Sequence, residues 1–100
     1  MRLIMEKLEI RYRKDPSIIS REIAGEVILV PIRRNVGDLE SIYTLNETGA
    51  RAWALVDGEQ TLGEICVQIM AEYEVSQVEV QKDLIELFDQ LLTIGALVRV

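Results

Sequence analysis

Apolar and polar residues follow two different spacings along the chain, and the change comes near residue 46. Before it, the pattern is typical of strands. In SIISREIAGEVILVPI, residues 17–32, two β-branched runs flank Gly25-Glu26, which predicts two antiparallel strands joined by a hairpin turn. The polar stretch RRNVGDLE, residues 33–40, predicts a loop, and SIYTL, residues 41–45, predicts a third strand.

After residue 46 the apolar residues take helical spacing. Asn46 is a good N-cap for a first helix that ends at Gly58. TLGE and SQVE each have the form of a capping box and predict the starts of a second and a third helix. The third helix is expected from Gln77 to Ile94, before a glycine stop. Residues 96–100, ALVRV, then either add a short terminal strand or pack down on the domain.

This order predicts an α+β domain, with a three-stranded antiparallel sheet followed by three helices. Residues 1–14 mix charged and apolar side chains without a clean period, so we interpret them as an N-terminal arm before a domain of residues 15–100. The chain has 100 residues, 49% of them apolar, which suits one domain with a modest core. We find no signal peptide and no apolar run of the roughly 18 residues needed to span a bilayer, and expect a soluble cytoplasmic protein.

The residue types for common catalytic and metal sites are missing from this sequence. It has no histidine, one cysteine and only single, scattered glycines, so neither a metal centre nor a phosphate-binding loop is expected. Cys66 lies in the apolar pattern EICVQIM and is expected in the core. The helical carboxylates are expected to form a solvated face: Glu72, Glu74, Asp83, Glu86 and Asp89. We therefore expect no enzyme activity and no cofactor.

The junction LNETGARAWALVDG, residues 45–58, contains a glycine that local propensity does not explain. Gly49 stands in the first turn of the first helix, where glycine costs about 0.8 to 1 kcal/mol relative to alanine. We expect it to permit a close approach of that helix to the sheet. Trp53, one turn later, is expected to anchor the helix in the core.

The tight turn between the second and third helices resembles the spacing of a helix-turn-helix, with the hairpin as a wing. Charge argues against binding to nucleic acid. Residues 51–100 contain three basic residues (Arg51, Lys82, Arg99) against nine acidic ones, and the net charge of the chain is −6, whereas phosphate neutralisation dominates such binding. Other basic residues lie in the arm and the loop: Arg11, Arg13, Lys14, Arg33 and Arg34. A nucleic-acid-binding protein stays an alternative.

The third helix has a wider apolar arc than a single contact requires. At about 100° per residue, one stripe forms a core-facing seam: Val80, Leu84, Leu87, Leu91 and Ile94. Ile85, Phe88 and Leu92 lie beside it, although a helix on one face of a sheet needs an arc of little more than 100°. Either the other helices cover these three residues, or they line a groove. The third strand can supply an open edge for an extended peptide beside that groove.

Three stretches together resemble the PqqD-like family, small domains related to coenzyme PQQ synthesis protein D. They are GEVILVP, YTLNETGARAWALVDGEQTLGEI and YEVSQVEVQKDLIELFDQLLTIGAL, and the resemblance covers about residues 10–98. It implies a winged-helix-like fold and a non-catalytic domain that recognises ribosomally made precursor peptides. SREIAGEVILVPI and the LNETGA junction differ from the PQQ-specific members, so the chain resembles a member that serves another pathway.

In such domains the leader region of the precursor adds as a strand to the third strand and lies against the last helix. The domain then presents the peptide to a modifying enzyme, often a radical S-adenosylmethionine enzyme. Carried onto this chain, the resemblance implies a strand site, a helix wall and two charged rim residues. The strand site is Ser41, Ile42, Tyr43, Thr44 and Leu45, the wall is Ile85, Phe88 and Leu92, and the rim is Lys82 and Asp89. A domain that dimerises through the same strand edge is a further alternative.

Overall fold

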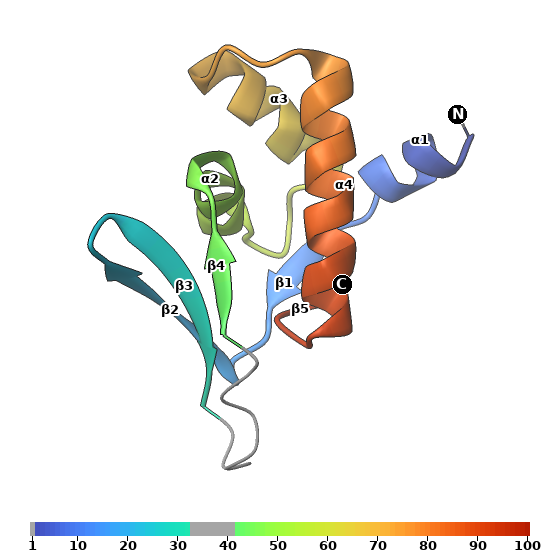
Figure 1. Ribbon diagram of the computed structural model, residues 1–100. Coiled ribbons are helices and arrows are strands. Elements are labelled where there is room, and N and C mark those ends of the chain that lie inside the picture. Colours follow the sequence, from blue (N-terminus) through green and yellow to red (C-terminus); the bar gives the residue numbers. More distant parts are fainter. Residues whose placement is uncertain (1, 33–41) are drawn as a thin grey trace.

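The computed structural model describes residues 2–32 and 42–100 (Figure 1). The predicted loop at residues 33–40 and the predicted strand residue Ser41 lie outside this part. The elements in chain order are α1 (Arg2–Leu8), β1 (Tyr12–Lys14), β2 (Ile18–Ile23), β3 (Glu26–Pro31), β4 (Tyr43–Leu45), α2 (Glu47–Leu55), α3 (Leu62–Glu72), α4 (Gln77–Thr93) and β5 (Leu97–Arg99). The prediction of an α+β domain is confirmed.

The predicted three-stranded antiparallel sheet is present, in the order β2-β3-β4. The β2–β3 hairpin turns at Ala24 and Gly25, whose φ angles are 54° and 83°, one residue earlier than predicted. Two positive φ angles in a two-residue loop suit the twist of a hairpin. In the described part of the chain β4 pairs with β3 alone, with Val27 opposite Leu45. β4 is therefore an edge strand, as the sequence predicted.

The N-terminal segment is more than the arm that we expected. It contains α1 and β1, and β1 pairs with β5 in a second, two-stranded antiparallel sheet. Tyr12 is buried, and its ring meets that of Phe88 edge-on at 5.1 Å between centroids. A helix of seven residues and a strand of three are too short to show a period, and the partner of β1 is at the other end of the chain.

All three long helices begin with the predicted N-cap. The side chains of Asn46, Thr61 and Ser76 each accept a hydrogen bond from the backbone N–H three residues on, which satisfies one otherwise unpaired donor. Thr61 and Glu64 form the full reciprocal capping box. At the start of α4, the structure gives only the Ser76 half of the predicted box.

The core lies between the sheets and the helices, and α4 runs through its middle, with β4 and α2 on one side and α1 on the other (Figure 1). The inward stripe of α4 consists of Val80, Leu84, Phe88 and Leu91. Trp53 and Cys66 are buried in the same core, as predicted. None of the helices that the structure describes is long and apolar enough to cross a membrane.

Candidate functional site

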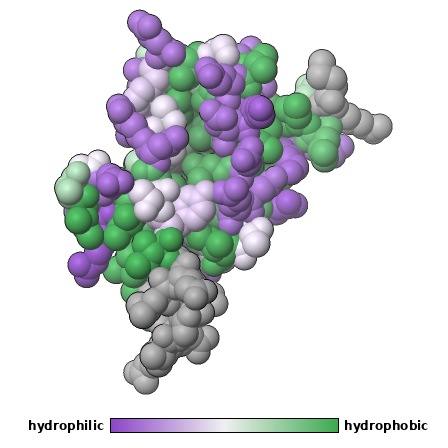
Figure 2. All heavy atoms as spheres, in the orientation of Figure 1, coloured by the Kyte–Doolittle hydropathy of each residue, from purple (hydrophilic) through white to green (hydrophobic). Residues whose placement is uncertain are grey.

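The open edge of β4 faces α4 across two hollows, which together we call the β4–α4 groove. The first, the Leu87 hollow, has a volume of about 190 Å³ and is lined by Thr44, Leu45, Asn46, Thr48, Gly49, Asp83, Leu84 and Leu87. The second, the Ile94 hollow, has a volume of about 280 Å³ and is lined by Tyr43, Asp89, Gln90, Thr93 and Ile94. Figure 2 shows apolar surface in the recess between α2 and α4, bordered by hydrophilic side chains.

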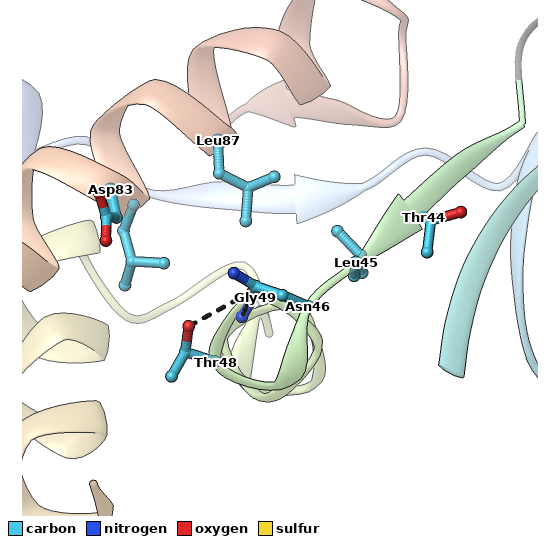
Figure 3. Close-up of a pocket in the computed structure, with 8 residues that line it drawn as sticks. Thr44, Leu45, Asn46, Thr48, Gly49, Asp83 and Leu87 are labelled. Atoms are coloured by element: carbon cyan, nitrogen blue, oxygen red, sulfur yellow. Dashed lines mark hydrogen bonds between the residues drawn. The ribbon is translucent and has the colours of Figure 1, made fainter. Parts of the chain in front are cut away.

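The Leu87 hollow explains the glycine of the junction. A Cβ atom on Gly49 would lie 2.8 Å from Asn46 Oδ1 and 3.1 Å from Leu87 Cδ2. Gly49 also donates its N–H to that same Asn46 oxygen, at 2.8 Å. Figure 3 shows Leu87 reaching from α4 toward the start of α2. The close approach predicted for Gly49 is therefore real, but it is to α4 and to the helix cap rather than to the sheet.

The Ile94 hollow is bridged by a hydrogen bond between its two walls. The Tyr43 hydroxyl, from β4, donates to Gln90 Oε1, from α4. Tyr43 and Leu45 are two residues apart and therefore point to the same face of the sheet. Leu45 is buried, Tyr43 is half-buried and Thr44 between them is exposed. One face of β4 thus packs on α4, while the edge of the strand stays open.

The predicted strand residues lie where the sequence suggested, as far as the structure describes them. Tyr43, Thr44 and Leu45 form β4, and all three line the groove. Ile42 precedes the strand, with 49% of its surface exposed. The strand is therefore shorter than the predicted segment, and its three residues form one wall of the site.

The structure does not bring the predicted helix wall to the groove, because Ile85, Phe88 and Leu92 line neither hollow. Phe88 has no exposed surface and packs in the core. Ile85 and Leu92 are four residues before and three after Asp89, so they share its flank of the helix. The side chain of Asp89 forms an ion pair with Lys7 of α1, which places α1 on that flank.

The two predicted rim residues also differ from expectation. Asp89 lines the Ile94 hollow, but its carboxylate is paired with Lys7. Lys82 is exposed and lines neither hollow. The structure therefore leaves neither residue as a free charge at the groove.

Apart from Asp89 and its neighbour Thr93, the exposed or half-buried helix residues that line the groove lie on the other flank of α4. Asp83, Leu87, Gln90 and Ile94 line the groove, and their spacing of four, three and four residues is that of one helical stripe. The sequence contained this stripe, but Leu87 and Ile94 were assigned to the core-facing seam and Asp83 to the solvated face. The sequence pattern does not indicate which flank of α4 lies beside β4, and this information is needed to predict the groove residues.

Cys66 does not take part in this site. Its side chain is 1% exposed, and burial raises the pKa of its thiol to about 11. The thiolate, which is the nucleophilic form, is therefore scarce at neutral pH. Cys66 is a core residue, as the sequence predicted.

Comparison with known proteins identifies the family of the chain. The family model of coenzyme PQQ synthesis protein D (PqqD) matches residues 26–97, which is more than half of the sequence. The chain belongs to the PqqD family. The matched region begins with β3 and contains β4 and the helices α2, α3 and α4, so both walls of the groove lie within it.

A solved structure is similar over most of the chain. TbiB1 in complex with the TbiA(beta) leader peptide is 26% identical in sequence, with a TM-score of 0.68, and the match covers 85% of this chain and 93% of that one. This PqqD-family chain therefore shares its fold with a protein whose structure was solved in complex with a leader peptide. The comparison with curated proteins gives no match.

Proposed function

We propose that this protein is a peptide-binding module that captures the leader region of a ribosomally synthesised precursor peptide. The peptide adds as a strand to the open edge of β4 and rests on the groove flank of α4. The observation that carries the proposal is the juxtaposition of an edge strand with an apolar groove of about 190 and 280 Å³ in its two parts. TbiB1, which is similar in fold and was solved with a leader peptide, supports the same role.

Hydrogen bonds to β4 alone are too few for useful affinity. The strand has three residues, and each strand hydrogen bond contributes about 0.5 to 1.5 kcal/mol. Micromolar binding requires about 8 kcal/mol after the entropy costs of association. Apolar side chains of the peptide must therefore enter the groove, where Leu45, Leu87 and Ile94 supply the contact surface.

The proposal extends to a partner enzyme and to the place in the cell where the protein acts. The bound leader would hold its precursor for a separate modifying enzyme, such as a radical S-adenosylmethionine enzyme, and the domain would contribute binding without catalysis of its own. We also propose that the fold is winged-helix-like and that the protein acts in the cytoplasm. The genes beside this one test the partner, because a short precursor and a modifying enzyme are expected there.

The decisive experiment is a titration of isotope-labelled protein with the leader peptide of a neighbouring precursor, followed by backbone amide resonances. We expect shifts concentrated at residues 43–45 and 83–94. A duplex DNA of mixed sequence serves as the control for the nucleic-acid-binding alternative, since salt-dependent binding to it would support that role. Shifts confined to β2 or α1 would overturn the assignment of the site.

Self-association through the same edge is the remaining alternative. A second copy that pairs along β4 would occupy the site of the peptide, so peptide and dimer would compete. Sedimentation with and without saturating peptide distinguishes the two. A monomer that stays a monomer in both conditions favours the peptide module, whereas a dimer that the peptide cannot dissociate contradicts binding at β4.

A further inference from the structure

A single carboxylate in the groove has no partner and bears on what the groove binds. Asp83 lines the Leu87 hollow and is exposed. Figure 3 shows it on α4, above the start of α2. Among the residues that the structure describes, none that lines the two hollows is a lysine or an arginine. The charge that the described groove offers to a peptide is therefore negative.

Two other carboxylates on the helices form ion pairs. Asp89 pairs with Lys7, and Glu72 forms a two-bond ion pair with Arg51 at 2.7 and 2.9 Å. Among the residues that the structure describes, none forms a hydrogen bond or an ion pair with the carboxylate of Asp83. It is the one carboxylate of that part of the chain that both lines the groove and lacks a partner.

Two further carboxylates and one lysine lie near Asp83 on α4. Glu79 lies one turn before it and Glu86 three residues after it, and both are exposed, so they face the same solvent beside the groove. Lys82 is adjacent in sequence, but successive residues of a helix point about 100° apart. Lys82 therefore does not share the face of Asp83 but lies beside Glu79 and Glu86, three and four residues away. Among the described residues that line the Leu87 hollow, Asp83 is the one with a charge.

We propose that Asp83 selects a basic peptide: the segment captured on β4 carries a lysine or arginine whose side chain pairs with the Asp83 carboxylate at the Leu87 hollow. This inference rests on the proposed function. A peptide that covers the hollow removes water from around the carboxylate, and the weaker screening strengthens the attraction between the two charges. An arginine can in addition form two parallel hydrogen bonds to the carboxylate.

The test begins with probes that need no knowledge of the natural leader. A displayed library of random 12-residue peptides is selected on the wild-type protein and on Asp83→Lys. We expect lysine and arginine to be enriched at one position beside an apolar residue on the wild type, and aspartate and glutamate to replace them on Asp83→Lys. Because Asp83 is exposed, both proteins should unfold at similar temperatures.

Calorimetry on the most enriched peptide then measures the pair directly. Asp83→Asn should weaken binding about two- to fivefold, as expected for an exposed ion pair, and should leave the affinity of a peptide with alanine at the basic position unchanged. Glu86→Gln is the matched control, since it removes a carboxylate from the same helix outside the hollow, and it should leave Kd within twofold. Reversing both charges, Asp83→Lys with a glutamate peptide, should restore binding.

The outcomes separate this inference from the function on which it rests. If selected peptides shift the amides of residues 43–45 but show no basic preference, or bind Asp83→Asn as tightly as the wild type, the basic selection is wrong and the peptide module stands. If the affinity loss of Glu86→Gln equals that of Asp83→Asn, the attraction is a general effect of net charge and the specific pair is refuted. If no peptide shifts those amides, both proposals fall.

Discussion

The two flanks of α4 carry similar side chains but have different partners. One flank bears Leu87 and Asp83 and faces the open edge of β4. The opposite flank bears Leu92, and at its border with the Ile94 hollow the carboxylate of Asp89 is paired with Lys7 of α1. The difference lies in what the fold brings to each side: a helix from the far end of the chain covers one flank, while three residues of edge strand leave a hollow on the other.

Phe88 lies between the two flanks, and its substitution tests whether it is a core residue or part of the groove wall. The side chain is fully buried against Tyr12, so Phe88→Ala should lower the free energy of unfolding by about 3 to 5 kcal/mol. Denaturant unfolding measures this loss. A stable Phe88→Ala protein that fails to bind peptide would instead return Phe88 to the wall of the groove and break the distinction between core and flanks.

The flanks themselves are compared by a matched pair of truncations, Leu87→Ala and Leu92→Ala. Both side chains are half-buried leucines on α4 that pack against the core, so we expect each change to cost about 1 to 2 kcal/mol of stability. Only Leu87→Ala should also weaken binding of the leader peptide, by about tenfold, because it removes groove surface. Calorimetric affinities and unfolding curves of the two variants give the comparison.

The flank comparison fails if Leu92→Ala weakens peptide binding as much as Leu87→Ala does. The peptide would then reach the flank that α1 occupies. Amide shifts at Lys7 and Leu8 in the same titration would reveal that arrangement. Their absence together with a selective effect of Leu87→Ala would assign the binding site to the groove flank.

Much of the fold could be predicted because its signals are local. The caps at Asn46, Thr61 and Ser76 mark helix starts with residues that lie within one turn, and the β2–β3 hairpin needs only its own turn. The packing of α1 on one flank of α4 depends on a contact such as Lys7–Asp89, 82 positions apart. No local period encodes such a contact, so the sequence predicted the strand beside the groove but not which flank of α4 lines the groove.

Gly49 tests how tightly the groove flank is held to the start of α2. Gly49→Ala adds a methyl group where Asn46 Oδ1 and Leu87 Cδ2 leave too little room. Helix propensity would favour alanine by about 1 kcal/mol, but we expect a net loss of about 1 to 2 kcal/mol because the cap or Leu87 has to move. Thermal or denaturant unfolding shows whether Gly49→Ala lowers or raises the free energy of unfolding.

A comparison with Leu87→Ala identifies which neighbour gives way. If Leu87 is the obstacle, the double variant Gly49→Ala/Leu87→Ala should lose less stability than the sum of the single variants. Additive losses would point to the Asn46 cap instead. A stabilised Gly49→Ala would mean that α4 lies farther from α2 than the structure places it.

The smallest expected effect comes from the ion pair on the covered flank. The side chains of Lys7 and Asp89 are 26% and 40% exposed, so water and salt screen the attraction, and we expect a coupling of about 0.5 to 1 kcal/mol. A double-mutant cycle with Lys7→Met and Asp89→Asn measures it from unfolding free energies at low and high salt. Asp83→Asn is the matched change on the groove flank and should leave stability within about 0.5 kcal/mol, because its carboxylate has no partner in the described part of the chain. A coupling near zero would mean that apolar contact alone holds α1 to α4. The two flanks would then differ in whether a helix covers them, but not in whether an ion pair adds to stability.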